Sequence, residues 1–132
     1  MAKTEESTIV GERKESATTF LRLAHSGQVR RAFESYAAPN FTHHNPEFRG
    51  DAESLAKAIE DSHAENPDSM LHVEHVVEEG DLVAVHSRVR QKPEDRDIAV
   101  VHLFRFEGDR ISEMWDVIQP APEKLVNENG MF

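Results

Sequence analysis

Apolar residues in the first half of the chain recur with the period of an α-helix. Three segments show this pattern in succession, and each is closed by residues that commonly end helices. Gly27 follows the first, Pro39 and Asn40 follow the second, and Pro67 follows the third, for which Asp51 is a suitable N-terminal cap. The apolar positions that define the three faces are Ala17, Phe20, Leu21 and Ala24, then Val29, Phe33 and Tyr36, and finally Leu55, Ala58 and Ile59.

From Met70 onward the period changes to two and β-branched residues become frequent. This pattern predicts about four strands, near residues 70–78, 82–90, 97–106 and 111–119. The segments between them, 79–81, 92–95 and 107–110, are rich in Gly, Pro, Asp and Glu and favour tight turns. The sequence therefore predicts an α+β domain in which three N-terminal helices pack on one face of an antiparallel sheet.

Length and composition narrow the class of protein. A chain of 132 residues suits one domain, here residues 1–132, with a flexible N-terminus at 1–12 and an extended C-terminal arm at 120–132. The net charge of −10 argues against nucleic-acid and anionic-membrane partners. The chain contains no cysteine. Since residues 1–12 lack a signal-peptide pattern and no apolar run approaches the ~20 residues of a membrane span, we expect a cytoplasmic protein.

Motif searches exclude several familiar chemistries. The sequence contains no phosphate-binding glycine motif, no H-E-x-x-H zinc motif and no G-x-S-x-G nucleophile motif. His72 and His75 are three residues apart on a predicted strand, so alternation would place them on opposite faces and separate them as metal ligands. The candidate chemistry must come from other groups.

Asp116 is the most informative polar residue, because it lies within the apolar run Met114-Trp115-Asp116-Val117-Ile118 of a predicted strand. A carboxylate in such surroundings either raises its pKa or finds a partner. Two interpretations stand at even weight. Asp116 is either a functional acid/base or the buried ion-pair partner of an arginine such as Arg88 or Arg105.

Two further groups of polar residues accompany it. If the hairpin joining the second and third strands is symmetric about Glu94, His86 lies opposite His102, and the two imidazoles form either a pocket pair or an ordinary hydrogen-bonded core pair. The loop Phe41-Thr42-His43-His44-Asn45-Pro46 is polar, and Pro46 forces Asn45 toward an extended backbone. This loop either lines a cavity or is a solvated connection.

Taken together, three helices, the FTHHNP loop, the run VVHLFRFEGDRISEMWDVIQP and the final NGMF resemble the SnoaL-like polyketide cyclases, in particular the subgroup of SnoaL-like aldol-condensation enzymes. These belong to the nuclear transport factor 2-like superfamily, and the resemblance covers about residues 15–132. It implies a curved sheet that forms a cone-shaped pocket under the helices, the cystatin-like fold. It also implies homodimers, here through the sheet face, and cyclases that use no metal or organic cofactor.

The resemblance also orients the predicted site. Ketosteroid isomerases of the same superfamily place a pocket acid in a strand similar to AVVHLFRF, where this chain has His102, and Met114, Asp116 and Ile118 would face the same cavity. That facing requires a one-residue bulge near Gly108-Asp109, since a simple hairpin pairs His102 with Trp115 instead. The isomerase base corresponds to Asn45, which cannot abstract a proton, and the family often has histidine where this chain has Met114.

We therefore expect an acid/base enzyme, a cyclase, isomerase or lyase acting on a small apolar carbonyl compound. The alternatives are a dimeric ligand-binding module without catalysis, and hydrolysis through a water held by Asp116 and a histidine, aided by Glu74 or Arg88. The predicted catalytic residues are Asp116, His44 and His102. The predicted substrate-binding residues are Asn45, His86, Met114, Ile118, Phe104 and Tyr36.

Overall fold

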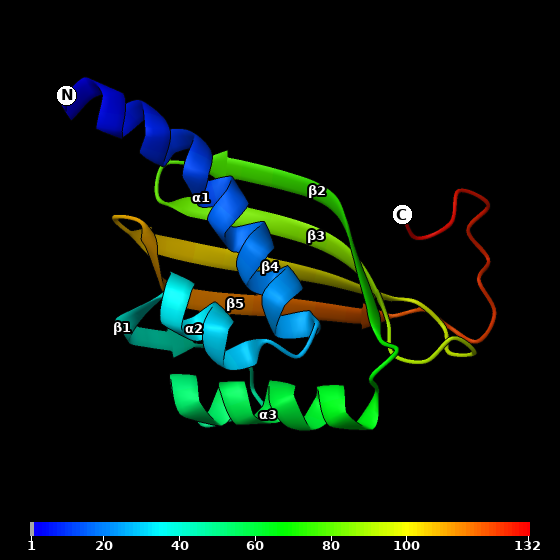
Figure 1. The fold of residues 1–132 in the computed structure, drawn as a ribbon. Coiled ribbons are helices and arrows are strands. Elements are labelled where there is room, and N and C mark those ends of the chain that lie inside the picture. The colour runs from blue at the N-terminus through cyan, green and yellow to red at the C-terminus, as the bar shows by residue number, and fades with distance from the viewer. Residues whose placement is uncertain (1) are drawn as a thin grey trace.

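The computed structural model describes residues 2–132, with side chains from Glu12 onward (Figure 1). The side chains of residues 1–11 lie outside the described part of the chain, and the flexible N-terminus predicted at residues 1–12 stays a prediction. The helices are α1 (Ala2–His25), α2 (Val29–Tyr36) and α3 (Ala52–Glu65). The strands are β1 (Ala37–His43), β2 (Met70–Glu79), β3 (Leu82–Arg90), β4 (Ile98–Glu107) and β5 (Arg110–Pro120).

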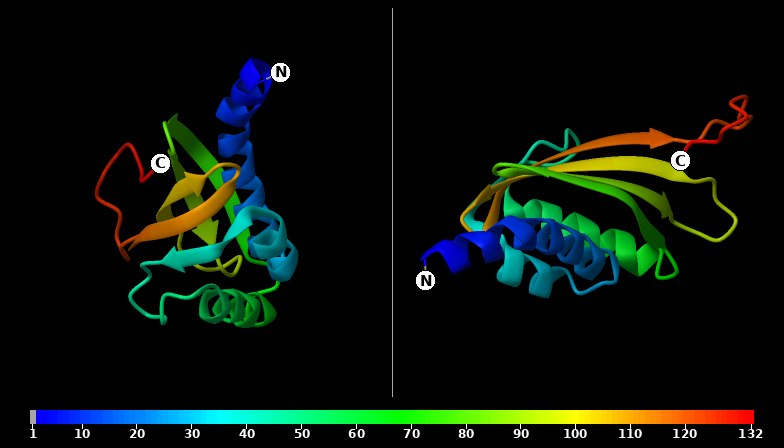
Figure 2. Two further views of the ribbon diagram at one scale, coloured as in Figure 1. Left: turned by 90° about the vertical axis from the view of Figure 1, so that its left-hand side faces the viewer. Right: turned by 90° about the horizontal axis from the view of Figure 1, so that it is seen from above.

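The helices pack on one face of a curved sheet with the strand order β1-β5-β4-β3-β2 (Figure 2). This arrangement confirms the predicted α+β fold, including the three helices and four of the strands. The sequence analysis missed β1, whose Pro39 and Asn40 were interpreted as the end of a helix. Proline is tolerated in an edge strand, and β1 forms an edge, pairing in parallel with β5. The sheet is therefore mixed and not wholly antiparallel.

Local sequence signals set the helix ends. Gly27 has a φ of +93°, which only glycine adopts easily, and the Gln28 amide donates to the Leu23 carbonyl at 2.9 Å as the chain leaves α1. The Asp51 carboxylate accepts a hydrogen bond from the Ser54 amide at 2.9 Å and caps α3. Both predicted signals are confirmed.

The core lies between α1, α2 and the inner face of the sheet. Phe20 of α1 meets Phe33 and Phe104 edge to face, with ring centroids 5.1 and 5.8 Å apart. Phe104, on β4, is fully buried in this cluster. Burying these large aromatic rings ties α1 to the middle of the sheet, and so fixes the helix that forms one wall of the cavity described below.

The register of β3 against β4 differs from the predicted one by a single residue. His86 pairs with Val101, and Val85 pairs with His102. The hairpin is centred between Pro93 and Glu94 and not on Glu94, and the side chains of Arg90 and Asp97, which face each other at its end, are joined by a hydrogen bond from Arg90 Nε to Asp97 Oδ1 at 2.8 Å. A one-residue slip moves a side chain to the other face, so the prediction that His86 and His102 lie side by side is wrong.

The predicted bulge between β4 and β5 is present, although it lies a few residues from the expected place. Arg105 pairs with Glu113 and Phe106 with Ile111, which leaves Ser112 as the extra residue. Beyond it His102 pairs with Asp116. The bulge therefore turns Asp116 to the inner face and Trp115 to the outer face.

A second bulge affects β2. His72 pairs with Arg88 and His75 with His86, so His72 and His75 share the outer face, contrary to the alternation that the sequence predicted. The Nδ1 atoms of His75 and His86 are 3.0 Å apart. Among the described residues, however, no three histidine, aspartate or glutamate side chains are placed to hold a metal ion together. Nor does any described helix have the length and apolar character to cross a membrane.

Candidate active site

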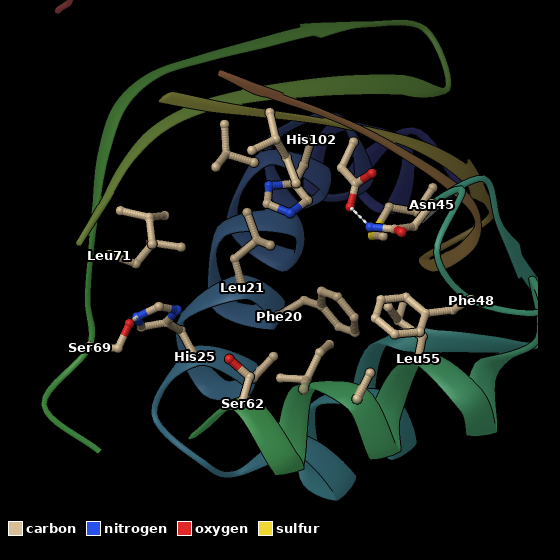
Figure 3. Close-up of a pocket in the computed structure, with 18 of the residues that line it drawn as sticks. Phe20, Leu21, His25, Asn45, Phe48, Leu55, Ser62, Ser69, Leu71 and His102 are labelled. Atoms are coloured by element: carbon tan, nitrogen blue, oxygen red, sulfur yellow. Dashed lines mark hydrogen bonds between the residues drawn. The ribbon is translucent and has the colours of Figure 1, made fainter. Parts of the chain in front are cut away.

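A cavity of about 340 Å³ opens between α1, α3 and the inner face of the sheet (Figure 3). Most of its wall is apolar and comes from residues such as Leu21, Leu55 and Leu71. Its size falls in the range of small-molecule sites. Polar groups gather in two places on this wall, one around Asp116 and one around His25.

The first group centres on Asp116. The Asn45 side chain donates a hydrogen bond from Nδ2 to Asp116 Oδ2 at 2.9 Å (Figure 3). The side-chain oxygen of Asn45, Oδ1, in turn accepts a hydrogen bond from the backbone N–H of Glu47 at 2.9 Å. Because Oδ1 is occupied by a donor, the amide can present only its NH₂ to Asp116. The loop therefore fixes one oxygen of the carboxylate.

His43 holds the same loop through a hydrogen bond to the backbone of Asn45. Its Nδ1 accepts the backbone N–H of Asn45 at 3.1 Å, which places the ring hydrogen of the neutral imidazole on Nε2. The His43 side chain is buried, and burial lowers its pKa despite the opposing effect of Asp116. A neutral His43 thus acts as a hydrogen-bond acceptor that holds Asn45 in place.

His102 stands opposite Asp116 in the β4–β5 pair and its ring points into the cavity (Figure 3). Burial lowers the pKa of His102 to about 4, although the carboxylate of Asp116 favours the charged form. The pKa of His102 is lowered further by His25. At neutral pH the cavity therefore contains a neutral imidazole, which keeps one N–H donor, beside a carboxylate.

The alternative structural roles for Asp116 find no support. Arg88 pairs with Glu74 at 3.4 Å, and Arg105 pairs with Asp81 at 3.0 Å, both on the outer face of the sheet. Neither arginine is the ion-pair partner of Asp116. The same contacts turn Glu74 and Arg88 away from the cavity, so the hydrolytic alternative that relied on them is wrong.

Two predicted histidines also lie outside the cavity. His44 Nε2 contacts Glu113 Oε2 at 2.6 Å, and its ring stacks on Trp115 with centroids 5.0 Å apart. The side chain at position 44 alternates with that of Asn45 and so faces the other way. His86 lies on the outer face for the register reason given above, and stacks against Phe132 of the C-terminal arm at 5.8 Å.

Of the other residues predicted to bind substrate, two line the cavity and two do not. Met114 and Ile118 line the cavity with Asp116, as expected for alternate residues of one strand. Phe104 is part of the core, and Tyr36 packs against the edge of that core; neither lines the cavity. The structure thus brings together Asp116, His102, Asn45, Met114 and Ile118, and separates His44, His86, Phe104 and Tyr36 from them.

The sequence analysis missed the second polar group, which consists of His25 and Ser69. Ser69 Oγ and His25 Nε2 are 2.9 Å apart, and both residues line the cavity. A signal was available for His25, since it follows Leu21 by four residues and so continues the apolar face of α1. Ser69 carries no comparable signal, because it lies in the turn between α3 and β2.

Comparisons with known proteins agree with this architecture. Residues 17–114 match the family model of the SnoaL-like domain. No curated protein matches the chain. Among solved structures, AclR of Streptomyces galilaeus, a proposed hydroxylase, is 21% identical with a TM-score of 0.71, over 83% of this chain and 90% of its own.

Two further structures have similar scores. IdmH of Streptomyces antibioticus, a proposed polyketide cyclase, is 20% identical with a TM-score of 0.68, over 80% of this chain and 91% of its own. A cystatin-fold protein of Novosphingobium aromaticivorans is 18% identical with a TM-score of 0.68, over 80% of this chain and 97% of its own. At these identities the structural likeness shows the fold alone, and the functions proposed for those proteins are not assigned to this chain.

Proposed function

This chain belongs to the SnoaL-like domain family, and we propose that it is an acid/base enzyme for a small, largely apolar carbonyl compound. The reaction class is an aldol-type cyclisation, an isomerisation or a related lyase step, carried out by side chains of the protein without a cofactor. One observation carries the proposal: a carboxylate held by Asn45 and a neutral imidazole meet in a mostly apolar cavity.

The proposed chemistry begins with a substrate that has a hydrogen on the carbon next to its carbonyl group. The Asp116 carboxylate removes this proton, and the electron pair of the C–H bond moves onto the carbonyl oxygen to give an enolate. The N–H of neutral His102 donates a hydrogen bond to that oxygen. An isomerisation is completed when Asp116 returns the proton to a different carbon of the enolate system, and an exchange when the proton on Asp116 is replaced from solvent and a deuteron returns to the same carbon. In an aldol reaction the enolate carbon attacks a second carbonyl, and the alkoxide so formed takes the proton from Asp116 to give the hydroxyl of the product.

Two points support this choice among possible acid/base reactions. The wall around the partly buried Asp116 is mostly apolar, which suits an apolar carbonyl compound. In addition, one protein with the same fold, IdmH, is described as a proposed polyketide cyclase. Asn45 stands where a ketosteroid isomerase would have its base, so Asp116 is the group that supplies this role in our proposal.

The proposal can be tested without knowledge of the natural substrate. The probe is 1-tetralone, a bicyclic ketone with exchangeable hydrogens next to its carbonyl group. NMR in D₂O measures the loss of these hydrogens. We expect the protein to accelerate exchange above the buffer rate and the Asp116→Asn variant to lose this acceleration. Exchange at the buffer rate with bound 1-tetralone and the wild-type protein would contradict the proposal.

A binding module without catalysis is the second candidate. The observation in its favour is Met114, which stands in the cavity wall where the family often has a histidine. The pH dependence separates the two functions. An enzyme that uses Asp116 as a base loses its rate as this carboxylate is protonated, whereas a carrier shows no chemical rate to lose.

The quaternary structure belongs to the same proposal. The outer face of the sheet exposes apolar side chains in its middle, including Val101 at 36% and Val117 at 67%. These two residues pair with each other across β4 and β5 and so form one continuous patch. A second copy of the chain would cover this patch, as the family resemblance implies, and we also retain a cytoplasmic location as a prediction.

A further inference from the structure

The proposed chemistry uses one end of the cavity and leaves its second polar group without a role. His25 and Ser69 lie at the other end from Asn45, with Leu21 between the two groups (Figure 3). They come from elements distant in sequence, the last turn of α1 and the turn that precedes β2. Their hydrogen bond of 2.9 Å therefore orders a polar site in a wall that is mostly apolar.

This polar site has unused hydrogen-bonding capacity. Ser69 Oγ engages His25 Nε2, so the remaining nitrogen, Nδ1, is on the side of the imidazole away from Ser69. The serine hydroxyl also keeps a further acceptor or donor function. A hydroxyl group of a bound molecule both donates and accepts, and so can satisfy either arrangement of the hydrogen between His25 and Ser69.

The charges around the cavity favour a neutral group at this end. Its described lining includes the acidic residues Glu47 and Asp116 but no lysine or arginine. Burial lowers the pKa of His25, so this imidazole is neutral at neutral pH. Arg22 lines a separate, adjoining pocket that shares His25 and Ser69 with this cavity. An ionised group inside the cavity would therefore lose hydration without gaining a cationic partner.

We propose that His25 and Ser69 form a specificity subsite for a neutral hydroxyl group of the substrate. This inference rests on the proposed function, because it takes the carbonyl end of the substrate to lie at Asp116 and His102. It defines the substrate class as a carbonyl compound with an apolar middle and a phenolic or alcoholic hydroxyl at the opposite end. His25 and Ser69 are binding residues in this account and take no part in proton transfer at carbon.

The test compares three probes that share one ring system: 1-tetralone, 6-hydroxy-1-tetralone and 6-carboxy-1-tetralone. Calorimetry or NMR titration gives their dissociation constants. We expect the wild-type protein to bind the hydroxyl compound about three- to tenfold more tightly than 1-tetralone, the gain of one or two neutral hydrogen bonds. Equal binding of these two probes, or tightest binding of the carboxylate, would overturn the proposal.

Variants test whether His25 and Ser69 cause this preference. Ser69→Ala should reduce the ratio of the two dissociation constants, 1-tetralone over 6-hydroxy-1-tetralone, to about one, and His25→Leu should do the same. Ser35→Ala, on the exposed side of α2, is the matched control and should keep it. Ser69 is only partly buried, so its loss should leave the fold intact even if His25→Leu does not fold. Survival of the full preference in Ser69→Ala would overturn the proposal.

The Asp116→Asn variant separates this proposal from the proposed function. It should lose deuterium exchange while it keeps the preference for the hydroxyl probe. If the wild-type protein catalyses no exchange yet prefers the hydroxyl probe through Ser69, the subsite stands and the proposed chemistry fails. If exchange depends on Asp116 but Ser69→Ala leaves probe binding unchanged, the chemistry stands and the subsite fails.

Discussion

Asn45 and Asp116 are separated by 71 positions in the chain, yet the amide of one holds the carboxylate of the other at 2.9 Å. The pairing of β1 with β5 brings them together, since His43 and Met114 are partners in that parallel ladder. Asn45 lies two residues beyond His43, Asp116 lies two residues beyond Met114, and both side chains point inward. The edge strand that the sequence analysis missed is thus the element that completes the site.

Replacing Asn45 by alanine should reduce catalysis of tetralone exchange by about tenfold or more. The variant removes the hydrogen bond that positions Asp116, and hydrogen bonds to charged groups contribute about 1.5–3 kcal/mol. Deuterium exchange followed by NMR measures the rate. Asn40→Ala is the control, because Asn40 contacts Glu107 on the outer side of the same strand and should leave the rate unchanged. A wild-type rate in Asn45→Ala would show that this contact is dispensable.

His44→Ala should keep the exchange rate within about twofold of the wild type. Its side chain pairs with Glu113 on the outside and does not line the cavity. An exposed contact of this kind contributes at most about 1 kcal/mol, so the loss in the free energy of unfolding should also be small. Kinetic assay and urea denaturation measure the two effects. A large fall in rate with unchanged stability would return His44 to the catalytic group.

Acid should destabilise the protein through His102. The pKa of this residue is about 4 when folded against an ordinary value of 6.5, so between these limits the unfolded chain binds a proton that the folded chain does not. The contribution of a neutral His102 to the free energy of unfolding is therefore fully present above about pH 6.5 and falls as the pH decreases toward 4, by about 3 kcal/mol.

Urea denaturation at several pH values measures this loss. His102→Asn should show a shallower dependence in the same window, while His25 and His43, whose pKa values are also lowered, leave a residual slope of the same sign. An identical slope in the wild type and His102→Asn would contradict the assignment.

A charge in the middle of the outer sheet face should separate a dimer into monomers. Val101→Glu places a carboxylate in the apolar patch that we expect a second copy to cover, and an unpaired buried charge is costly. Sedimentation velocity gives the oligomeric state at micromolar concentration. Val126→Glu is the control, because Val126 is 82% exposed in the C-terminal arm. A wild-type chain that sediments as a monomer would remove the proposal of a dimer.

The sequence was informative wherever one residue type meets one local requirement. Gly27 and Asp51 marked helix ends correctly because a positive φ and a free amide each favour few residues. Asp116 was identified because a carboxylate in an apolar strand needs an explanation. The bulge that turns it inward was expected from the family resemblance, although Ser112, which forms it, gave no signal of its own.

The errors arose where facing depends on a register that distant residues set. His86 was assigned to the cavity because its strand pairing was counted from Glu94, whereas the hairpin is centred between Pro93 and Glu94, which shifts that pairing by one residue. His44 was chosen over its neighbours without knowledge of β1. Just after the end of β1 at His43, the Asn45 side chain points inward and that of His44 outward. No pattern in the hexapeptide itself shows that this strand is present.

The central claim is that Asp116, as a positioned base, distinguishes this cavity from an ordinary apolar pocket. The most direct measurement is the rate of deuterium exchange into 1-tetralone for Asp116→Asn beside Glu47→Gln, the second carboxylate of the cavity wall. The account predicts a loss of about 100-fold or more for Asp116→Asn and near wild-type exchange for Glu47→Gln. Equal losses in both variants, or an undiminished rate in Asp116→Asn, would contradict it.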